Sequence, residues 1–182
     1  PVEGEVIGKT RVTDIIDKGL NRGALLYSER RLTDASTGEL LATMMNTTFC
    51  RGDGGVGGPS GPVKPVAQLP ERSPGMSIDL PTLAQAALIY RLNADDNPLH
   101  AEPAVARAAG FERPILHGLC TMGGAGHALL RALGYDASAF TSISVRFSAP
   151  VYPGETLITD IWQDGEELFF RTRVAERDLV VL

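Results

Sequence analysis

Three polar side chains with complementary proton chemistry lie close together in the middle of the chain. Asp95, Asn97 and His100 follow shortly after the apolar run Ala86–Tyr90. A carboxylate accepts hydrogen bonds when ionised, and an imidazole carries a proton on either nitrogen, so this pair could take one proton while giving another. Pro98 fixes its own backbone and disfavours helix for the residue before it. We therefore expect a rigid turn that aims Asp95 and His100 at one water molecule.

The same residue types also have a plainer interpretation. Asp, Asn and Pro are frequent in turns and helix caps, where they need no catalytic role. Two observations favour chemistry. The run lies between apolar segments, and a second polar run, Pro114–Thr121, follows it along the chain.

The two runs match motifs of a known family. Residues 95–100 match D-x-N-P-L-H, and residues 114–121 read P-I-L-H-G-L-C-T. In this order they resemble the (R)-specific enoyl-CoA hydratases, the type 2 or MaoC-like hydratases of the hot-dog fold. The resemblance extends over essentially the whole chain. One departure is that Asn93-Ala94 stand where the family usually has Ser-Gly.

This resemblance implies an enzyme of fatty acid metabolism that adds water reversibly to a trans-2-enoyl-CoA, giving a (3R)-3-hydroxyacyl-CoA. Asp95 and His100 would be the acid–base pair that holds the water, and Asn97 would orient that water or brace the loop. The backbone N–H of Gly118 would donate a hydrogen bond to the thioester oxygen as negative charge develops there. No metal or separate cofactor is implied, because coenzyme A is part of the substrate.

Further residues are expected near the substrate by the same resemblance: Lys18, Asp96, Pro98, Leu99 and Phe147. Each has a plainer alternative. Lys18 could be a turn lysine, Asp96 a solvent-facing side chain and Phe147 a core residue of a strand. We interpret His117 and His127 as packed or capping residues and not as catalysts.

The spacing at which apolar residues recur along the sequence predicts an α+β protein. Strands are expected at residues 5–16, 23–32, 39–50, 143–147, 156–162 and 167–175, and helices at residues 82–93, 104–109 and 116–133. The apolar face of the longest helix would consist of Leu119, Met122, Leu129, Leu130 and Leu133. An antiparallel sheet wrapped around one central helix is the hot-dog architecture that the resemblance names.

A weak internal repeat suggests how the chain is organised. Residues 1–5, with Asp-Lys-Gly downstream, echo residues 151–155, with Asp-Gly downstream. We expect a tandem double hot dog whose first repeat is incomplete. The expected divisions are a non-catalytic partial repeat at residues 1–50, a Pro/Gly-rich crossover at residues 51–81 and a catalytic domain at residues 82–182.

The crossover contains a formal G-x-G-x-x-G match beginning at Gly52. We reject a dinucleotide site there, because that fingerprint needs a following helix and Pro59 and Pro62 prevent one. Backbone amides of the glycines could instead approach a phosphate, so part of this loop is expected to line the coenzyme A site.

Composition and charge indicate which kinds of partner and which cellular compartment to expect. The net charge is −5 and basic residues form no run, which argues against nucleic acid as a partner. Cys50 and Cys120 have no metal-type spacing and are expected to be free thiols in a reducing compartment. No apolar run could span a bilayer, and neither a signal peptide nor a C-terminal peroxisomal address is visible. We expect a cytoplasmic homodimer, or a peroxisomal one in a eukaryote.

Two other functions remain open. One is the reverse reaction, dehydration of a (3R)-hydroxyacyl thioester on coenzyme A or an acyl carrier protein. The other is a thioesterase or a non-catalytic acyl-CoA binder on the same fold, since a fold does not fix a function. The spacing of Asp95 and His100 counts against the thioesterase and the binder, because neither needs that pair.

Overall fold

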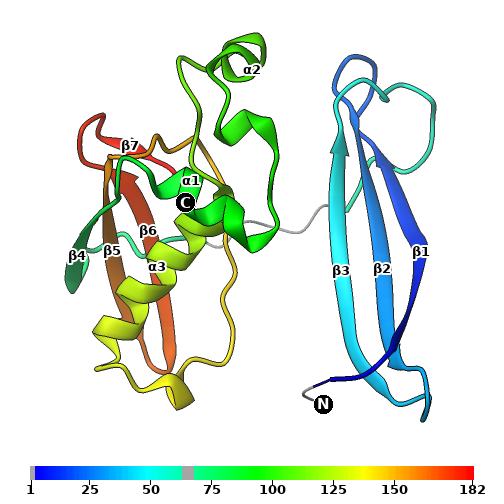
Figure 1. Ribbon diagram of the computed structural model, residues 1–182, viewed down its shortest axis with the longest axis horizontal. Helices are drawn as coiled ribbons and strands as arrows, with labels where there is room; N and C mark the ends of the chain where they lie inside the picture. Colours follow the sequence, from blue (N-terminus) through cyan, green and yellow to red (C-terminus); the bar gives the residue numbers. More distant parts are fainter. Residues whose placement is uncertain (1–2, 63–67) are drawn as a thin grey trace. The chain divides into compact units, whose positions relative to one another are not determined.

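The computed structural model describes residues 3–62 and 68–182 of the chain, which divides into two units, residues 1–65 and 66–182 (Figure 1). Each unit has its own antiparallel sheet. The first holds three strands in the order β1-β2-β3, and the second holds four in the order β4-β5-β6-β7.

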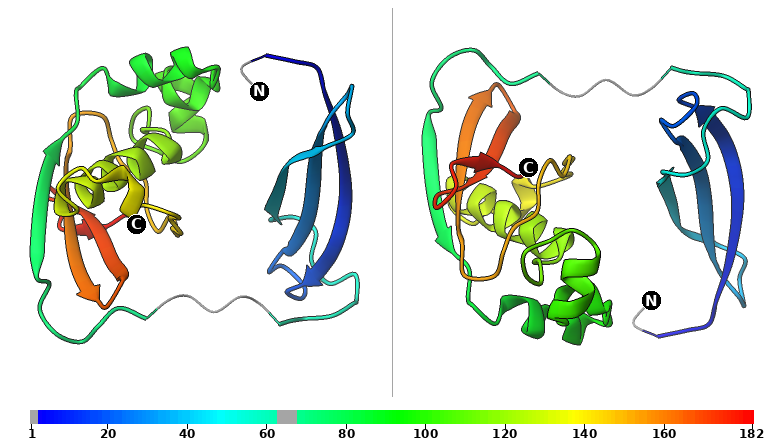
Figure 2. Two further views of the ribbon diagram at one scale, coloured as in Figure 1. Left: turned by 90° about the horizontal axis from the view of Figure 1, so that it is seen from below. Right: turned by 90° about the horizontal axis from the view of Figure 1, so that it is seen from above.

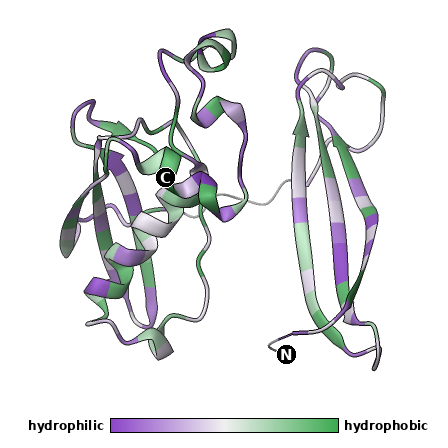
Figure 3. Ribbon diagram, viewed as in Figure 1, coloured by the Kyte–Doolittle hydropathy of each residue, from purple (hydrophilic) through white to green (hydrophobic). Residues whose placement is uncertain are grey.

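The first unit is a meander of long strands, which confirms the three strands predicted before residue 51. Its strands are β1 (Val6–Asp17), β2 (Ala24–Asp34) and β3 (Leu40–Cys50). Apolar and polar residues are interspersed along them (Figure 3). Several large apolar side chains are about half exposed within this unit, among them Val12, Met45 and Phe49.

A buried carboxylate ties the glycine-rich loop to the turn between β1 and β2. Both oxygens of Asp17 accept hydrogen bonds from backbone N–H groups, Gly19 at 2.8 Å, Gly55 at 2.8 Å and Gly57 at 2.7 Å. These N–H donors hold the pKa of Asp17 below its usual value. Gly54 approaches the backbone of Gly19 so closely that no side chain could fit there. The amides of Gly55 and Gly57 therefore bind Asp17, whereas we had expected glycines of this loop to face a phosphate.

The second unit packs a helix against its sheet. The strands are β4 (Met76–Pro81), β5 (Thr156–Asp164), β6 (Glu167–Val174) and β7 (Leu179–Val180). The α-helices are α1 (Ala86–Tyr90), α2 (Pro103–Ala108) and α3 (Gly118–Ala132), and short 3-10 turns lie at η1 (Arg91–Asn93), η2 (Pro98–His100) and η3 (Ala137–Ala139). Helix α3 crosses one face of the sheet (Figures 1 and 2). Its buried side chains meet strand residues such as Ile78 and Ile161 in the core.

Small residues, and not the predicted large ones, form most of the buried face of α3. Thr121, Ala125, Ala128 and Leu129 are buried, whereas Leu119 is 59% exposed. Our prediction of the apolar face was therefore right at Leu129 and wrong at Leu119. Small side chains allow the helix axis to approach the sheet, so the helix packs through its alanines.

Two other expectations need correction. The segment at residues 143–147 is not a strand, although the Ser148 N–H donates to the Val181 carbonyl at 2.9 Å. Alternation alone suggested a strand there, but ladder pairing with a neighbour is needed to make one. The predicted crossover at residues 51–81 also ends differently, because Met76–Pro81 forms β4 and pairs with β5.

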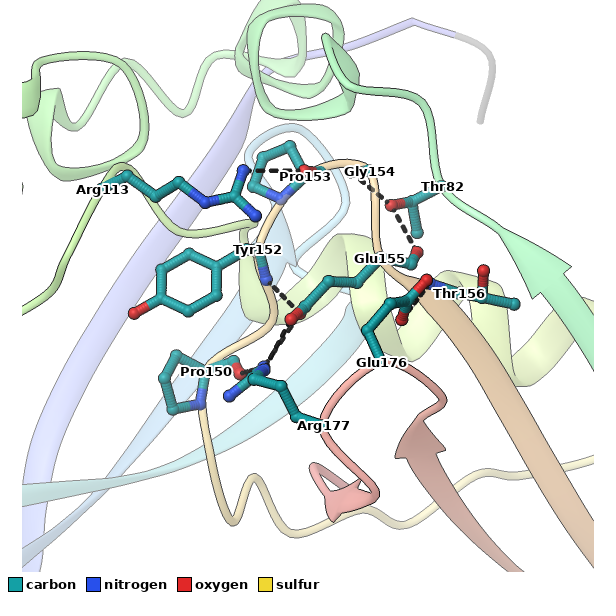
Figure 4. Close-up of polar contacts among 10 residues, drawn as sticks. All are labelled: Thr82, Arg113, Pro150, Tyr152, Pro153, Gly154, Glu155, Thr156, Glu176 and Arg177. Atoms are coloured by element: carbon teal, nitrogen blue, oxygen red, sulfur yellow. Dashed lines mark hydrogen bonds and ion pairs between the residues drawn. The ribbon is translucent and has the colours of Figure 1, made fainter.

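A buried ion pair stabilises the turn that leads into β5 (Figure 4). The Glu155 carboxylate accepts the Tyr152 N–H at 2.7 Å and two hydrogen bonds from the Arg177 guanidinium. The ring of Tyr152 lies between two guanidinium groups, Arg113 at 4.8 Å and Arg177 at 5.1 Å. This cluster connects the end of β6 to the chain segment that precedes β5.

Among the described residues, none of the helices combines the length and the apolar character needed to cross a bilayer.

Candidate active site

The backbone preferences of a few residues account for most of the predicted turn. The 3-10 turn η1 ends at Ala94, whose φ of +63° lies in the left-handed region. The Asn97 side chain then caps η2, because its Oδ1 accepts the Leu99 N–H at 3.1 Å. Pro98 takes the first position of η2, where a missing N–H costs nothing. Asn97 therefore braces this loop, which is one of the two roles we had expected for it.

Asp95 and His100 come together, and a third residue joins them. Asp95, His100 and His117 each offer one side-chain oxygen or nitrogen that could bind a metal, and these three atoms lie within 4.8 Å of one another. The Nδ1 of His100 is 2.8 Å from the Ile115 carbonyl oxygen. A carbonyl only accepts, so Nδ1 carries the proton and donates it. The Nε2 of His100 is then the nitrogen with a free lone pair, as a general base requires.

His117 is the most deeply buried member of this cluster, with only 1% of its surface exposed. Its ring lies 4.7 Å from the ring of Tyr90 and stacks on His100 at 3.8 Å between centroids. Its Nε2–H donates to the backbone carbonyl of Asp95 at 3.2 Å. Burial lowers the pKa of His117, so the ring is neutral. The expectation of a packed histidine agrees with this geometry.

The N-terminus of α3 follows immediately in the sequence. Gly118 is the first residue of α3, and the first N–H groups of a helix have no acceptor inside it. The Phe147 ring covers this residue, because a Cβ built on Gly118 would lie 3.2 Å from it. Two predicted site residues thus come together here, and glycine leaves room for the aromatic ring.

The remaining predicted residues are more scattered. Asp96 is exposed, Leu99 is half-buried, and Lys18 lies in the first unit with its ammonium 5.7 Å from the Phe49 ring centre. His127 is exposed and its Nε2 lies 3.0 Å from the Tyr135 hydroxyl. None of these four lies in the cluster of Asp95, His100 and His117.

The cluster offers ligands of the type that bind transition metals, but its geometry is unsuited to one ion. The His100 and His117 rings are stacked with only 27° between their planes. The nitrogen lone pairs lie in those planes, so nearly parallel stacked rings cannot direct both lone pairs at one point. The hydrogen bonds of both rings also fix their orientation.

Two hollows flank the cluster. One of about 570 Å³ runs along α3 and is bordered by mostly apolar residues, including Tyr90, Leu116, Leu119, Cys120, Gly123 and Leu157. Burial raises the pKa of the Cys120 thiol, which stays protonated there. A smaller hollow of about 190 Å³ is bordered by His100 together with Arg113 and Pro153.

Two contributors to the site were not predicted from the sequence. Tyr90 packs on His117, and the Ile115 carbonyl fixes the tautomer of His100. Helical spacing places Tyr90 at the end of α1 beside the turn, so its position in the sequence could have indicated it. No side-chain pattern reveals a backbone carbonyl such as that of Ile115.

Ala94 gives a prediction about stability. A left-handed backbone costs a residue with a Cβ about 1–2 kcal/mol, and glycine avoids this cost. We expect Ala94→Gly to raise the free energy of unfolding by about 1 kcal/mol in urea titrations. The matched control is Ala104→Gly in α2, where a right-handed helix makes glycine destabilising. Equal changes in both variants would contradict the prediction.

Comparison with known proteins assigns the family. A family model described as "MaoC like domain" matches residues 65–182, a range that includes Asp95, His100 and His117. The chain belongs to the MaoC-like domain family. The MaoC-like region coincides closely with the second structural unit, residues 66–182.

Two curated relatives of this MaoC-like chain match nearly all of it. The "3-hydroxyacyl-thioester dehydratase Y" of Mycobacterium tuberculosis is 46% identical over 181 residues, which are 98% of this chain and 62% of the relative. The peroxisomal "Enoyl-CoA hydratase 2" of Arabidopsis thaliana is 39% identical over 192 residues, covering 100% and 62%. The chain thus spans less than two thirds of the length of either relative.

Two solved structures agree on the fold. A MaoC-like dehydratase from Phytophthora capsici has a TM-score of 0.83 and 38% identity, covering 97% of this chain and 61% of that one. A Mycobacterium tuberculosis protein described as having a double hotdogfold has a TM-score of 0.53 and 18% identity, covering 97% and 67%. The hot-dog class expected from the sequence is therefore confirmed.

Proposed function

We propose that the chain catalyses reversible hydration of a trans-2-enoyl-CoA to a (3R)-3-hydroxyacyl-CoA. The observation that carries this proposal is the pairing of Asp95 with His100 in one cluster, with Nε2 of His100 left free by the hydrogen bond at Nδ1. Curated relatives named as an enoyl-CoA hydratase and a hydroxyacyl-thioester dehydratase support it, since the two names describe one reaction in opposite directions.

Each step has a group to perform it. Asp95 and His100 hold a water and accept its proton as the oxygen attacks C3, and the same pair returns one proton to C2. Negative charge that develops on the thioester oxygen is stabilised by the Gly118 N–H at the N-terminus of α3. The thioester itself polarises the alkene, so the proposed reaction uses no metal and no further cofactor.

The surroundings suit such a substrate. Tyr90 borders the mostly apolar hollow along α3 and also contacts His117, so this hollow adjoins the cluster and could hold an acyl chain. The Phe147 ring over Gly118 would flank the thioester. We propose Asp96, Pro98 and Leu99 as further parts of the rim, and Lys18 as a further residue that contacts the substrate.

The proposal extends to the architecture. The first unit is proposed as the sheet portion of a first, non-catalytic hot-dog repeat in a tandem double hot dog, incomplete in this chain. The strands that begin at Val6 and Thr156 support this, because each follows a Gly-Glu pair, residues 4–5 and 154–155. A homodimer in the cytoplasm or in a peroxisome remains part of the same proposal.

The deciding experiment follows the ultraviolet band of the conjugated enoyl thioester. We expect this chain to remove the band from a short and a long trans-2-enoyl-CoA and to yield the (3R) product, identified by chiral analysis. A stable band with release of free thiol would point instead to a thioesterase. A stable band without thiol would contradict the hydratase, and a (3R)-hydroxyacyl carrier-protein substrate would then test the dehydratase alternative.

A further inference from the structure

We infer that His117 is a positioning residue that sets the geometry of three groups at once: Asp95, His100 and the Gly118 N–H. This inference rests on the proposed function for its kinetic consequences. It assigns no proton transfer to His117 itself. Its structural basis is that a single buried ring contacts the elements that carry all three groups.

The first contact is with the turn that carries Asp95. The Nε2–H of His117 donates to the Asp95 backbone carbonyl at 3.2 Å, across 22 residues of sequence. This hydrogen bond attaches the start of α3 to the turn between η1 and η2. Because it holds the backbone of Asp95, it limits where the carboxylate can point.

The second contact is with the general base. The His117 ring stacks on the His100 ring at 3.8 Å, and Tyr90 packs on His117 at 4.7 Å. The stacked His117 ring therefore restrains the His100 ring from tilting out of its plane. The hydrogen bond from Nδ1 to the Ile115 carbonyl restrains it from rotating within that plane. Two orthogonal restraints fix the direction of the His100 Nε2 lone pair.

The third connection is covalent. His117 is the residue before Gly118, and its carbonyl accepts the Thr121 N–H at 3.1 Å in the first turn of α3. Fixing the His117 ring thus also fixes the peptide unit between His117 and Gly118. This peptide carries the N–H that we propose as the oxyanion donor.

The neutral ring is required for this arrangement. The Nδ1 of His117 is buried and has no hydrogen-bond partner among the described residues. A protonated ring would place a buried N–H donor at Nδ1 without an acceptor. Positive charge on His100 and Arg91 disfavours the protonated ring, and the negative charge of Asp95 favours it. Burial is the largest influence and lowers the pKa of His117. One tautomer, with the proton on Nε2, is therefore fixed.

Two substitutions separate the hydrogen bond from the ring. His117→Phe keeps a flat ring that stacks on His100 but removes the donor to Asp95. His117→Gln keeps an amide donor near the place of Nε2 but removes the ring. We expect His117→Phe to lower kcat about 10- to 100-fold with little change in KM, because small displacements of reacting groups are costly. His117→Gln should recover a large part of that loss.

The second readout does not need activity. We expect hydrogen exchange at the amides of Leu99, His100 and Ala101, which are hydrogen-bonded in the turn, to accelerate about tenfold in His117→Phe and less in His117→Gln. Exchange in β5 and β6 should stay unchanged. Unchanged exchange in the turn would overturn the inference, whether or not the protein proves to be a hydratase.

A double variant tests whether His117 acts through Asp95. In an Asp95→Asn background, removing the His117 donor should cost kcat less than about twofold more, since effects of residues that act as a unit are not additive. A full multiplicative loss would overturn the inference. If His117→Phe fails to fold, unchanged exchange at Leu99, His100 and Ala101 in a folded His117→Gln variant, which lacks the stacked ring, would also overturn it. An inactive wild type would overturn the proposed function alone.

Discussion

Replacing Asp95 by Asn is expected to lower turnover of a trans-2-enoyl-CoA by roughly 10²- to 10⁴-fold while the fold persists. The amide has nearly the size of the carboxylate and keeps a hydrogen-bonding oxygen, so packing of the half-buried turn is retained. It cannot, however, accept the proton of the attacking water. The loss should lie in kcat, because Asn can still hold a water beside His100.

A second aspartate provides the control. Asp79 is exposed on β4 and lies outside the cluster, so Asp79→Asn removes the same charge without touching the proposed chemistry. Its turnover should stay near that of the wild type. Circular dichroism and a urea titration would verify folding of both variants. Near-wild-type turnover in folded Asp95→Asn would refute the acid–base assignment.

The site was predictable where local rules decide the geometry. Pro98 and Asn97 dictate a capped turn from their own backbone preferences, and both occupy the positions those preferences favour. The start of α2 at Pro103, with Gly110 beyond its end, follows the same kind of rule. Motif order then identified the hot-dog family, which composition alone would not have done.

The buried face of α3 and the stacking of His117 on His100 could not be predicted, because both depend on packing between residues far apart in the sequence. Whether a helix meets its sheet through leucines or alanines depends on the distance between them, so Leu119 was assigned to the wrong face of α3. The stacking of His117 on His100 joins two motifs that lie apart in the sequence. Neither motif alone indicates that their imidazoles lie face to face.

Breaking the buried ion pair that precedes β5 should destabilise the second unit. Glu155 is 5% exposed, and its carboxylate accepts hydrogen bonds from the Tyr152 N–H and from Arg177 (Figure 4). Glu155→Ala leaves the Tyr152 N–H without its acceptor. It also removes the counter-ion of the Arg177 guanidinium, which keeps a hydrogen bond to the Pro150 carbonyl at 2.7 Å. We expect a loss of about 2–3 kcal/mol in the free energy of unfolding, below the range for fully buried pairs because the Arg177 side chain is 30% exposed.

A double substitution shows whether that loss comes from the unpaired cation. Arg177→Met in the Glu155→Ala background removes the guanidinium and leaves an apolar side chain, so part of the lost stability should return. Glu176→Ala is the matched control, because its carboxylate caps the Thr156 N–H at an exposed site and its removal should cost less. Urea titrations of the four proteins measure these differences. If Glu155→Ala proved no more destabilising than Glu176→Ala, the ion pair would not stabilise this turn, and the apolar contacts of Val151 and Leu157 would have to hold it.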